Sequence, residues 1–109
     1  MKLQEIIDKL ALNALTVTDE RDVSGVFISD MLSDVMSSAQ PGNLWLTVQS
    51  HKNIVSAANL VDISAVVVTY DKKVPEDTIE LANRFHVIIL GSPHSTFELA
   101  TKLVEAGIK

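Results

Sequence analysis

The chain has 109 residues, a net charge of −5 at pH 7, 47% hydrophobic residues, 21% charged residues and no cysteine. This length accommodates one domain with a single core, and the composition is that of a globular protein. The acidic balance argues against a nucleic-acid partner, because no basic stripe is present to neutralise phosphates. The absence of cysteine excludes disulfides, thiolate zinc sites and cysteine nucleophiles.

The sequence shows no membrane-targeting pattern. Residues 1–5 carry charges from the second position on, which is not the pattern of a signal peptide. No apolar run approaches the roughly 20 residues that a membrane span needs. We therefore expect a cytoplasmic protein with no membrane partner, and the lack of cysteine agrees with that compartment.

The first part of the chain predicts two helices and two strands. Apolar residues at helical spacing indicate a helix over 3–12, and apolar runs indicate strands at 15–18 and 23–28. The charged residues 19–22 between these strands are typical of a solvated turn. A second, amphipathic helix follows. Its apolar residues are Met31, Leu32, Val35, Met36 and Ala39.

The rest of the chain repeats one unit three times, namely an apolar strand, a short polar loop and a helix. The strands are expected at 44–49, 65–68 and 87–90. Strands that alternate with helices pack in parallel, so all three loops should emerge at one edge of the sheet. The sequence therefore predicts an α/β fold: a single compact domain with a mostly parallel central sheet of about five strands, flanked by about five helices.

The three helices of these units have recognisable beginnings and faces. The second begins at Pro75, which suits a first helical position, and the third begins with Ser95 and Glu98 at the spacing of a capping box. The apolar stripe expected to be buried in the third helix consists of Phe97, Ala100, Val104 and Ile108.

The strands differ in how completely they should be covered. The strands at 65–68 and 87–90 are apolar throughout, as expected of strands with both faces covered. The strand at 44–49 alternates, so the face that carries Trp45 and Thr47 is expected to be partly covered. Together with Met31 and Met36, these two residues are candidates for a subunit interface. Packing in the core is the alternative for Trp45 and the two methionines.

The loops at the strand ends hold the candidate ligand-binding residues, because open α/β proteins bind ligands at that edge. Lysines, hydroxyls and backbone N–H groups at a helix N-terminus can hold an anion. The alternative is that these residues form helix caps and solvated turns. The candidates are Ser50, His51, Lys52 and Asn53 in the first loop, Thr69 and Lys72 in the second, and Gly91 and Ser92 in the third.

None of these loops carries a recognised catalytic pattern. The chain lacks the G-x-S-x-G elbow, and neither phosphate-binding glycine motif can be hidden among four glycines. His51, Asp71 and His94 lie in three different loops without the spacing of a metal site. We therefore expect no catalytic residue, no metal site and no cofactor. Phosphoryl chemistry that uses His51 or His94 is the enzymatic alternative.

Several segments resemble one family. Residues 30–36, 41–48 and 51–58, with the later helix from Pro75 and the strand at 87–90, are similar to the DRTGG domain over about residues 1–108. The resemblance implies a compact α/β domain similar to the amino-terminal domain of HPr kinase. Such domains occur alone, between paired CBS modules and inside phosphotransacetylases, and we expect a stand-alone one here.

The motifs that name the family are altered in this chain. The family carries Asp-Arg after one strand and Thr-Gly-Gly after the next. These positions fall at His51-Lys52 and at Thr69-Tyr70-Asp71, where only Thr69 agrees. The loss of both glycines removes the close backbone approach that they would permit.

The resemblance implies a non-catalytic regulatory or scaffolding module that homodimerises and serves a partner enzyme or signalling protein. The alternative is a small-molecule sensor that binds a nucleotide or a phosphorylated metabolite at the strand-end loops.

Overall fold

The central element of the structure is a mostly parallel sheet, as predicted. The computed structural model describes residues 1–108, and within them the sheet has five strands in the order β1-β5-β4-β3-β2. Strands β2 to β5 run parallel, and β1 pairs antiparallel with β5. The strands are β1 (Asn13–Ala14), β2 (Val26–Ile28), β3 (Leu44–Thr47), β4 (Ala65–Val68) and β5 (Ile89–Gly91).

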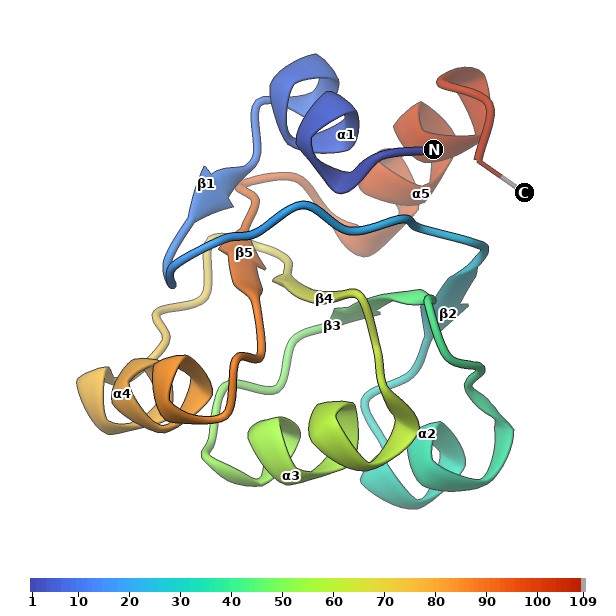
Figure 1. Cartoon of the computed structure of the whole chain (residues 1–109). Coiled ribbons are helices and arrows are strands. Elements are labelled where there is room, and N and C mark those ends of the chain that lie inside the picture. The colour runs from blue at the N-terminus through green and yellow to red at the C-terminus, as the bar shows by residue number, and fades with distance from the viewer. Residues whose placement is uncertain (109) are drawn as a thin grey trace.

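Helices cover both faces of the sheet and make a three-layer sandwich (Figure 1). On one face lie α1 (Leu3–Leu10) and α5 (Thr96–Glu105). On the other lie α2 (Leu32–Ser38), α3 (Asn53–Val61) and α4 (Glu76–Arg84). Among the described residues no helix is long and apolar enough to cross a membrane.

Alternate residues of each central strand supply two cores. Leu44 and Leu46 belong to the core beneath α1 and α5, whereas Trp45 belongs to the core beneath α2, α3 and α4. The face of β3 that carries Trp45 and Thr47 was expected to be partly covered, and this is wrong. Trp45 is 0% exposed and Thr47 is 1% exposed, because α2 and α3 close over that face.

The first predicted strand begins earlier than expected and is shorter. The ladder between β1 and β5 ends after Ala14, because the hydroxyl of Thr16 accepts the hydrogen bond of Ile89 N at 3.0 Å. The backbone of Val17 then donates to the side chain of Asn83 at 2.9 Å. The backbone of Leu15 still donates to Ile89 O at 3.0 Å, but from Thr16 on side chains replace the backbone partners that a strand to residue 18 would need.

The last helix has its predicted start but not its predicted buried face. Ser95 Oγ accepts from Glu98 N at 3.1 Å, and Glu98 Oε1 accepts from Ser95 N at 3.3 Å, which completes the capping box. The core side of α5 is formed by Leu99 and Leu103, with Ile108 just beyond the helix. Of the predicted stripe, Ile108 is buried and Ala100 packs against the core, whereas Phe97 and Val104 are 80% and 70% exposed and point outward.

Candidate functional site

The parallel strands place their following loops at one edge of the sheet, as predicted. The end of β3 is joined there to the loop after β2 through Asp30. Asp30 Oδ1 accepts from Thr47 Oγ1 and from Val48 N, each at 2.9 Å. The indole of Trp45 donates to Ser29 O at 2.8 Å in the same loop. These bonds use Trp45 and Thr47 within one chain and correct the expectation that they face a second subunit.

Thr69 joins the end of β4 to two other elements. Its backbone donates to Thr47 O at 3.0 Å, and its hydroxyl lies 2.8 Å from the hydroxyl of Thr96, which begins α5. Thr69 is 0% exposed. The one residue that matches the family's Thr-Gly-Gly motif therefore has a structural contact at each of its polar groups.

The next two residues hold a backbone conformation that glycine normally supplies. Tyr70 and Asp71 have φ angles of 60° and 56°. Their N–H groups donate to His94 O and Ser92 O, both at 2.9 Å, so the loop after β5 holds them in place. Two consecutive non-glycine residues thus hold a left-handed conformation that glycine adopts without strain.

Restoring glycine at these positions is expected to stabilise the fold. A left-handed conformation costs a non-glycine residue about 1–2 kcal/mol, and glycine adopts it freely but loses more chain entropy on folding. We expect Tyr70→Gly and Asp71→Gly each to raise the free energy of unfolding by about 0.5–1 kcal/mol. Urea denaturation followed by the fluorescence of Trp45, the single tryptophan, measures this change. Tyr70→Ala is the control, since alanine keeps the strain and should bring no gain.

Three of the candidate ligand-binding residues line one cavity at this edge. The cavity has a volume of about 310 Å³ and includes Lys72, Gly91 and Ser92. Asp71 and Lys73 lie on its wall as well, so the charges around it are mixed. Ser92 is 2% exposed, and its hydroxyl accepts from His94 N at 3.2 Å.

The four candidates of the first loop lie apart from this cavity. Lys52 Nζ approaches Asp77 at 3.9 Å on the surface, and the backbone oxygen of Ser50 accepts from Thr78 Oγ1 at 3.0 Å. His51 and Asn53 are exposed at the start of α3. The structure therefore divides the predicted strand-end site into one cavity and one separate loop.

The buried polar side chains of this edge all have hydrogen-bond partners. No buried side-chain nitrogen or oxygen of residues 1–108 is left without a hydrogen-bond partner. In the same part of the chain, no three histidine, aspartate or glutamate side chains are placed to hold a metal ion. The pKa of Glu98 is held below its ordinary value, chiefly by the N–H of Ser95 in the capping box and also by Lys102 and His94. That carboxylate therefore stays charged and stabilises the start of α5 by accepting the hydrogen bond of Ser95 N.

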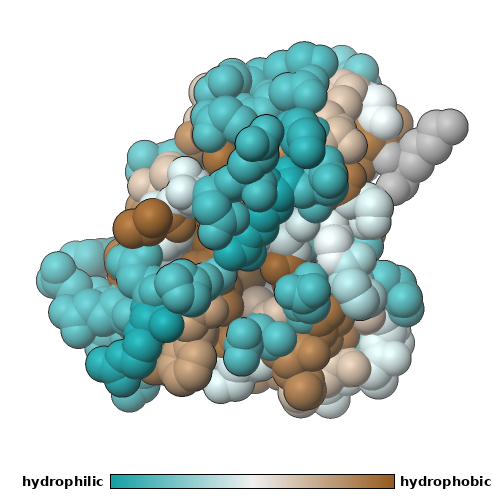
Figure 2. Space-filling model, in the orientation of Figure 1, coloured by the Kyte–Doolittle hydropathy of each residue, from teal (hydrophilic) through white to brown (hydrophobic). Residues whose placement is uncertain are grey.

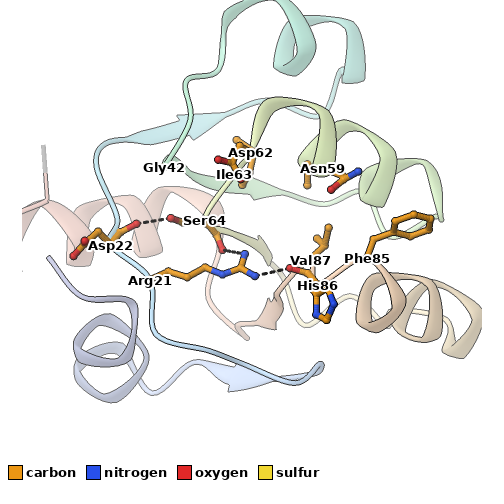
Figure 3. Close-up of a pocket in the computed structure, with 11 residues that line it drawn as sticks. Arg21, Asp22, Gly42, Asn59, Asp62, Ile63, Ser64, Phe85, His86 and Val87 are labelled. Carbon is orange, nitrogen blue, oxygen red and sulfur yellow. Dashed lines mark hydrogen bonds between the residues drawn. The ribbon is translucent and has the colours of Figure 1, made fainter.

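A larger cavity of about 510 Å³ lies at the opposite edge of the sheet, where β4 and β5 begin (Figure 3). The side chain of Arg21 is part of the cavity wall. The guanidinium donates to Ser64 O at 3.1 Å and to His86 O, and it also pairs with Asp19 at 2.6 Å. The hydrogen bond from Arg21 lowers the pKa of Asp19.

Sequence reasoning missed this arrangement because residues 19–22 have the composition of a solvated turn. The backbone partners of Arg21 lie 43 and 65 residues further along the chain. No local pattern identifies carbonyl groups as the partners of an arginine. Arg21 therefore joins the starts of two strands. The charged residues next to it in the sequence give no indication of this structural role.

The layers and the strand order define a three-layer α/β sandwich domain with a mostly parallel five-stranded sheet. Residues 2–106 match the model of the DRTGG domain, and the chain belongs to that family. None of the curated protein sequences compared with the chain matches it.

A solved structure shares the fold. It is the crystal structure of the CBS and DRTGG domains of the regulatory region of Clostridium perfringens pyrophosphatase, complexed with its activator, diadenosine tetraphosphate. The TM-score is 0.77 at 18% sequence identity, and the match covers 95% of this chain and 46% of the other. The chain thus spans about half the length of that structure, and the likeness at this identity concerns the fold.

Proposed function

We propose that this chain is a non-catalytic regulatory or scaffolding module that acts as a homodimer. Its membership of the DRTGG family supports a regulatory role, since the structurally similar domain belongs to the regulatory region of an enzyme. A partner enzyme or signalling protein would bind the dimer and respond to its state. The polar groups of the strand-end edge support the same role, because they hold loops together rather than converge on a reacting atom.

The observation that carries the proposal is the apolar surface that one chain leaves uncovered on both helical layers, including Phe97 and Val104 of α5, which are 80% and 70% exposed. Met31 and Met36, the two candidate interface residues that remain on the surface, are 59% and 48% exposed. Leu60 is 70% exposed beside Met36, at a groove of about 400 Å³. Figure 2 shows hydrophobic residues gathered along α3 on the face in view. Contiguous apolar surface of this kind marks sites of association.

Size-exclusion chromatography with light scattering tests the homodimer. We expect the mass of two chains, about 24 kDa given 11.9 kDa for one chain, at micromolar concentration. A single-chain mass at several hundred micromolar would contradict the proposal. The test needs no knowledge of the partner that the module serves.

The second candidate function is a sensor of phosphorylated small molecules. The cavity at the ends of β4 and β5 favours it, because Lys72, Gly91 and Ser92 lie together there. A nucleotide or a phosphorylated metabolite would place an anionic group against Lys72.

A thermal-shift screen of nucleotides and sugar phosphates tests the sensor. A ligand present at 100 times its dissociation constant stabilises a protein by about 2.7 kcal/mol, which raises the melting temperature by several degrees. Lys72→Ala should abolish the shift, and Lys52→Ala, which lies outside the cavity, should keep it. A shift that survives Lys72→Ala, or no shift with any compound, would contradict a site in this cavity.

A further inference from the structure

The outward face of α5 carries an apolar stripe that one chain does not use. Phe97 and Val104 are 80% and 70% exposed, and Ala100 and Thr101 lie between them on the same face of the helix. The hydroxyl of Thr101 already donates to Phe97 O at 2.9 Å, so it brings no unpaired donor to an apolar contact. The core side of the helix is formed by Leu99 and Leu103, and Ala100 is partly buried at the border of that core. The outward part of the stripe therefore consists of Phe97, Thr101 and Val104.

The stripe has the same pattern when it is read in either direction. The large residues Phe97 and Val104 stand at its ends, and the small residues Ala100 and Thr101 stand at its centre. When two such helices cross antiparallel about a twofold axis, Phe97 of one lies against Val104 of the other. The small central residues let the two backbones approach. A twofold contact requires this self-complementarity.

A hollow lies where the phenylalanine of a second chain would arrive. A cavity of about 310 Å³ separates α5 from the edge strand β2. Val104 and Ile108 line it on one side, and Val26 and Ile28 line it on the other. Ile28 is 51% exposed and extends the apolar surface onto the sheet edge. Each chain thus offers one protruding aromatic side chain and one apolar hollow.

The charges beside the stripe are also complementary in this arrangement. Glu98 and Lys102 lie one turn apart on the flank of α5 that points away from the sheet, and both are exposed. In an antiparallel pair the same flanks of the two helices meet, so Glu98 of each chain lies beside Lys102 of the other. Two symmetric pairs of opposite charge form, although the chain as a whole carries a net charge of −5.

We propose that a second copy of this chain docks on the outward face of α5, with Phe97 of each copy in the hollow between α5 and β2 of the other. This inference rests on the proposed homodimer and names its surface. The groove beside Met36 on the opposite layer is the competing surface, and no charged side chain lines it.

Cross-linking through single introduced cysteines tests the arrangement directly, because the natural chain has no cysteine. Thr101→Cys places two thiols near the twofold axis, within the Cα separation of roughly 4.4–6.8 Å that a disulfide allows. Under mild oxidation most of this variant should migrate as a covalent dimer. Ser56→Cys, equally exposed but on α3, is the matched control and should stay monomeric on a non-reducing gel. The reverse result would overturn the proposal.

Light scattering on substituted chains separates the failure of this surface from the failure of the homodimer. Phe97→Asp should give a single-chain mass and Met36→Asp should leave the dimer intact, both residues being surface positions. Lys102→Glu should weaken the dimer by about tenfold, whereas Lys9→Glu on α1, which makes the same change in net charge, should not. A natural chain that is already monomeric overturns both proposals. A dimer that persists in Phe97→Asp overturns only the α5 surface.

Discussion

Replacing Trp45 by alanine is expected to lower the free energy of unfolding by about 3–5 kcal/mol, the largest effect of any single substitution considered for this chain. Trp45 is 0% exposed on β3, an inner strand of the sheet, where it fills the core beneath α2 and α3. The change would leave a cavity the size of an indole and would remove the hydrogen bond to Ser29 O. For a domain whose total stability is about 5–15 kcal/mol, this loss is a large share.

Far-UV circular dichroism in urea measures this loss, since the variant has no tryptophan to follow. Trp45→Phe is the matched control. Phenylalanine keeps most of the buried volume and loses chiefly the partly buried bond to Ser29, so a cost of about 1–2 kcal/mol is expected. If Trp45→Ala cost less than Trp45→Phe, the burial described for this side chain would be wrong.

Removing the guanidinium of Arg21 is expected to cost about 2 kcal/mol. Arg21 donates to Ser64 O and to His86 O, and its side chain is only 23% exposed. Arg21→Ala would leave both carbonyls without their charged donor. Arg21→Lys should recover part of the loss, because an ammonium lacks the planar fork that reaches several acceptors together. Urea denaturation followed by Trp45 fluorescence measures both variants.

The control for Arg21 is Lys2, which forms an ion pair with Asp22 at 3.2 Å on the surface. Both partners are at least half exposed, so Lys2→Ala should change stability by no more than about 0.5 kcal/mol.

The dependence of stability on acid pH gives a second measurement of the role of Arg21. The pKa of Asp19 is lowered by the hydrogen bond from Arg21, so its stabilising contribution is present above pH ~4 and is lost as the pH falls below that value. In Arg21→Ala this part of the acid dependence should disappear.

Most of the architecture follows from local patterns. The three strand–loop–helix units, the capping box at Ser95 and the mostly parallel sheet are confirmed. The errors concern contacts between segments that are far apart in sequence. The face of Trp45 is covered by α2 and α3, and the ladder of β1 is interrupted by the hydroxyl of Thr16. Neither partner is specified by residues near the position in question.

The last helix illustrates why burial is harder to predict than helix formation. Apolar residues lie on two sides of α5, and periodicity alone does not say which side meets the sheet. The predicted buried stripe is correct at Ile108 but wrong at Phe97 and Val104, because Leu99 and Leu103 supply the core side of the helix. The candidate site, like the helix, was predictable in its location but not in its detailed contacts. The edge was correctly located, whereas the separation of the first loop from the cavity beside Lys72 depends on where the loops turn.

The contacts of the amino-terminal segment also set an order on how the chain can fold during synthesis. Thr16, Val17 and Arg21 are bonded to Ile89, Asn83 and His86, all near the far end of the chain. These bonds span 65 to 73 residues, so during synthesis the segment from Thr16 to Arg21 cannot complete its contacts until β5 has emerged. Until then the parallel units from β2 to β4 can assemble on their own, through pairings between neighbouring segments. A chain truncated before β5 would therefore keep the pairings of β2, β3 and β4, but the segment from Thr16 to Arg21 would lack its partners.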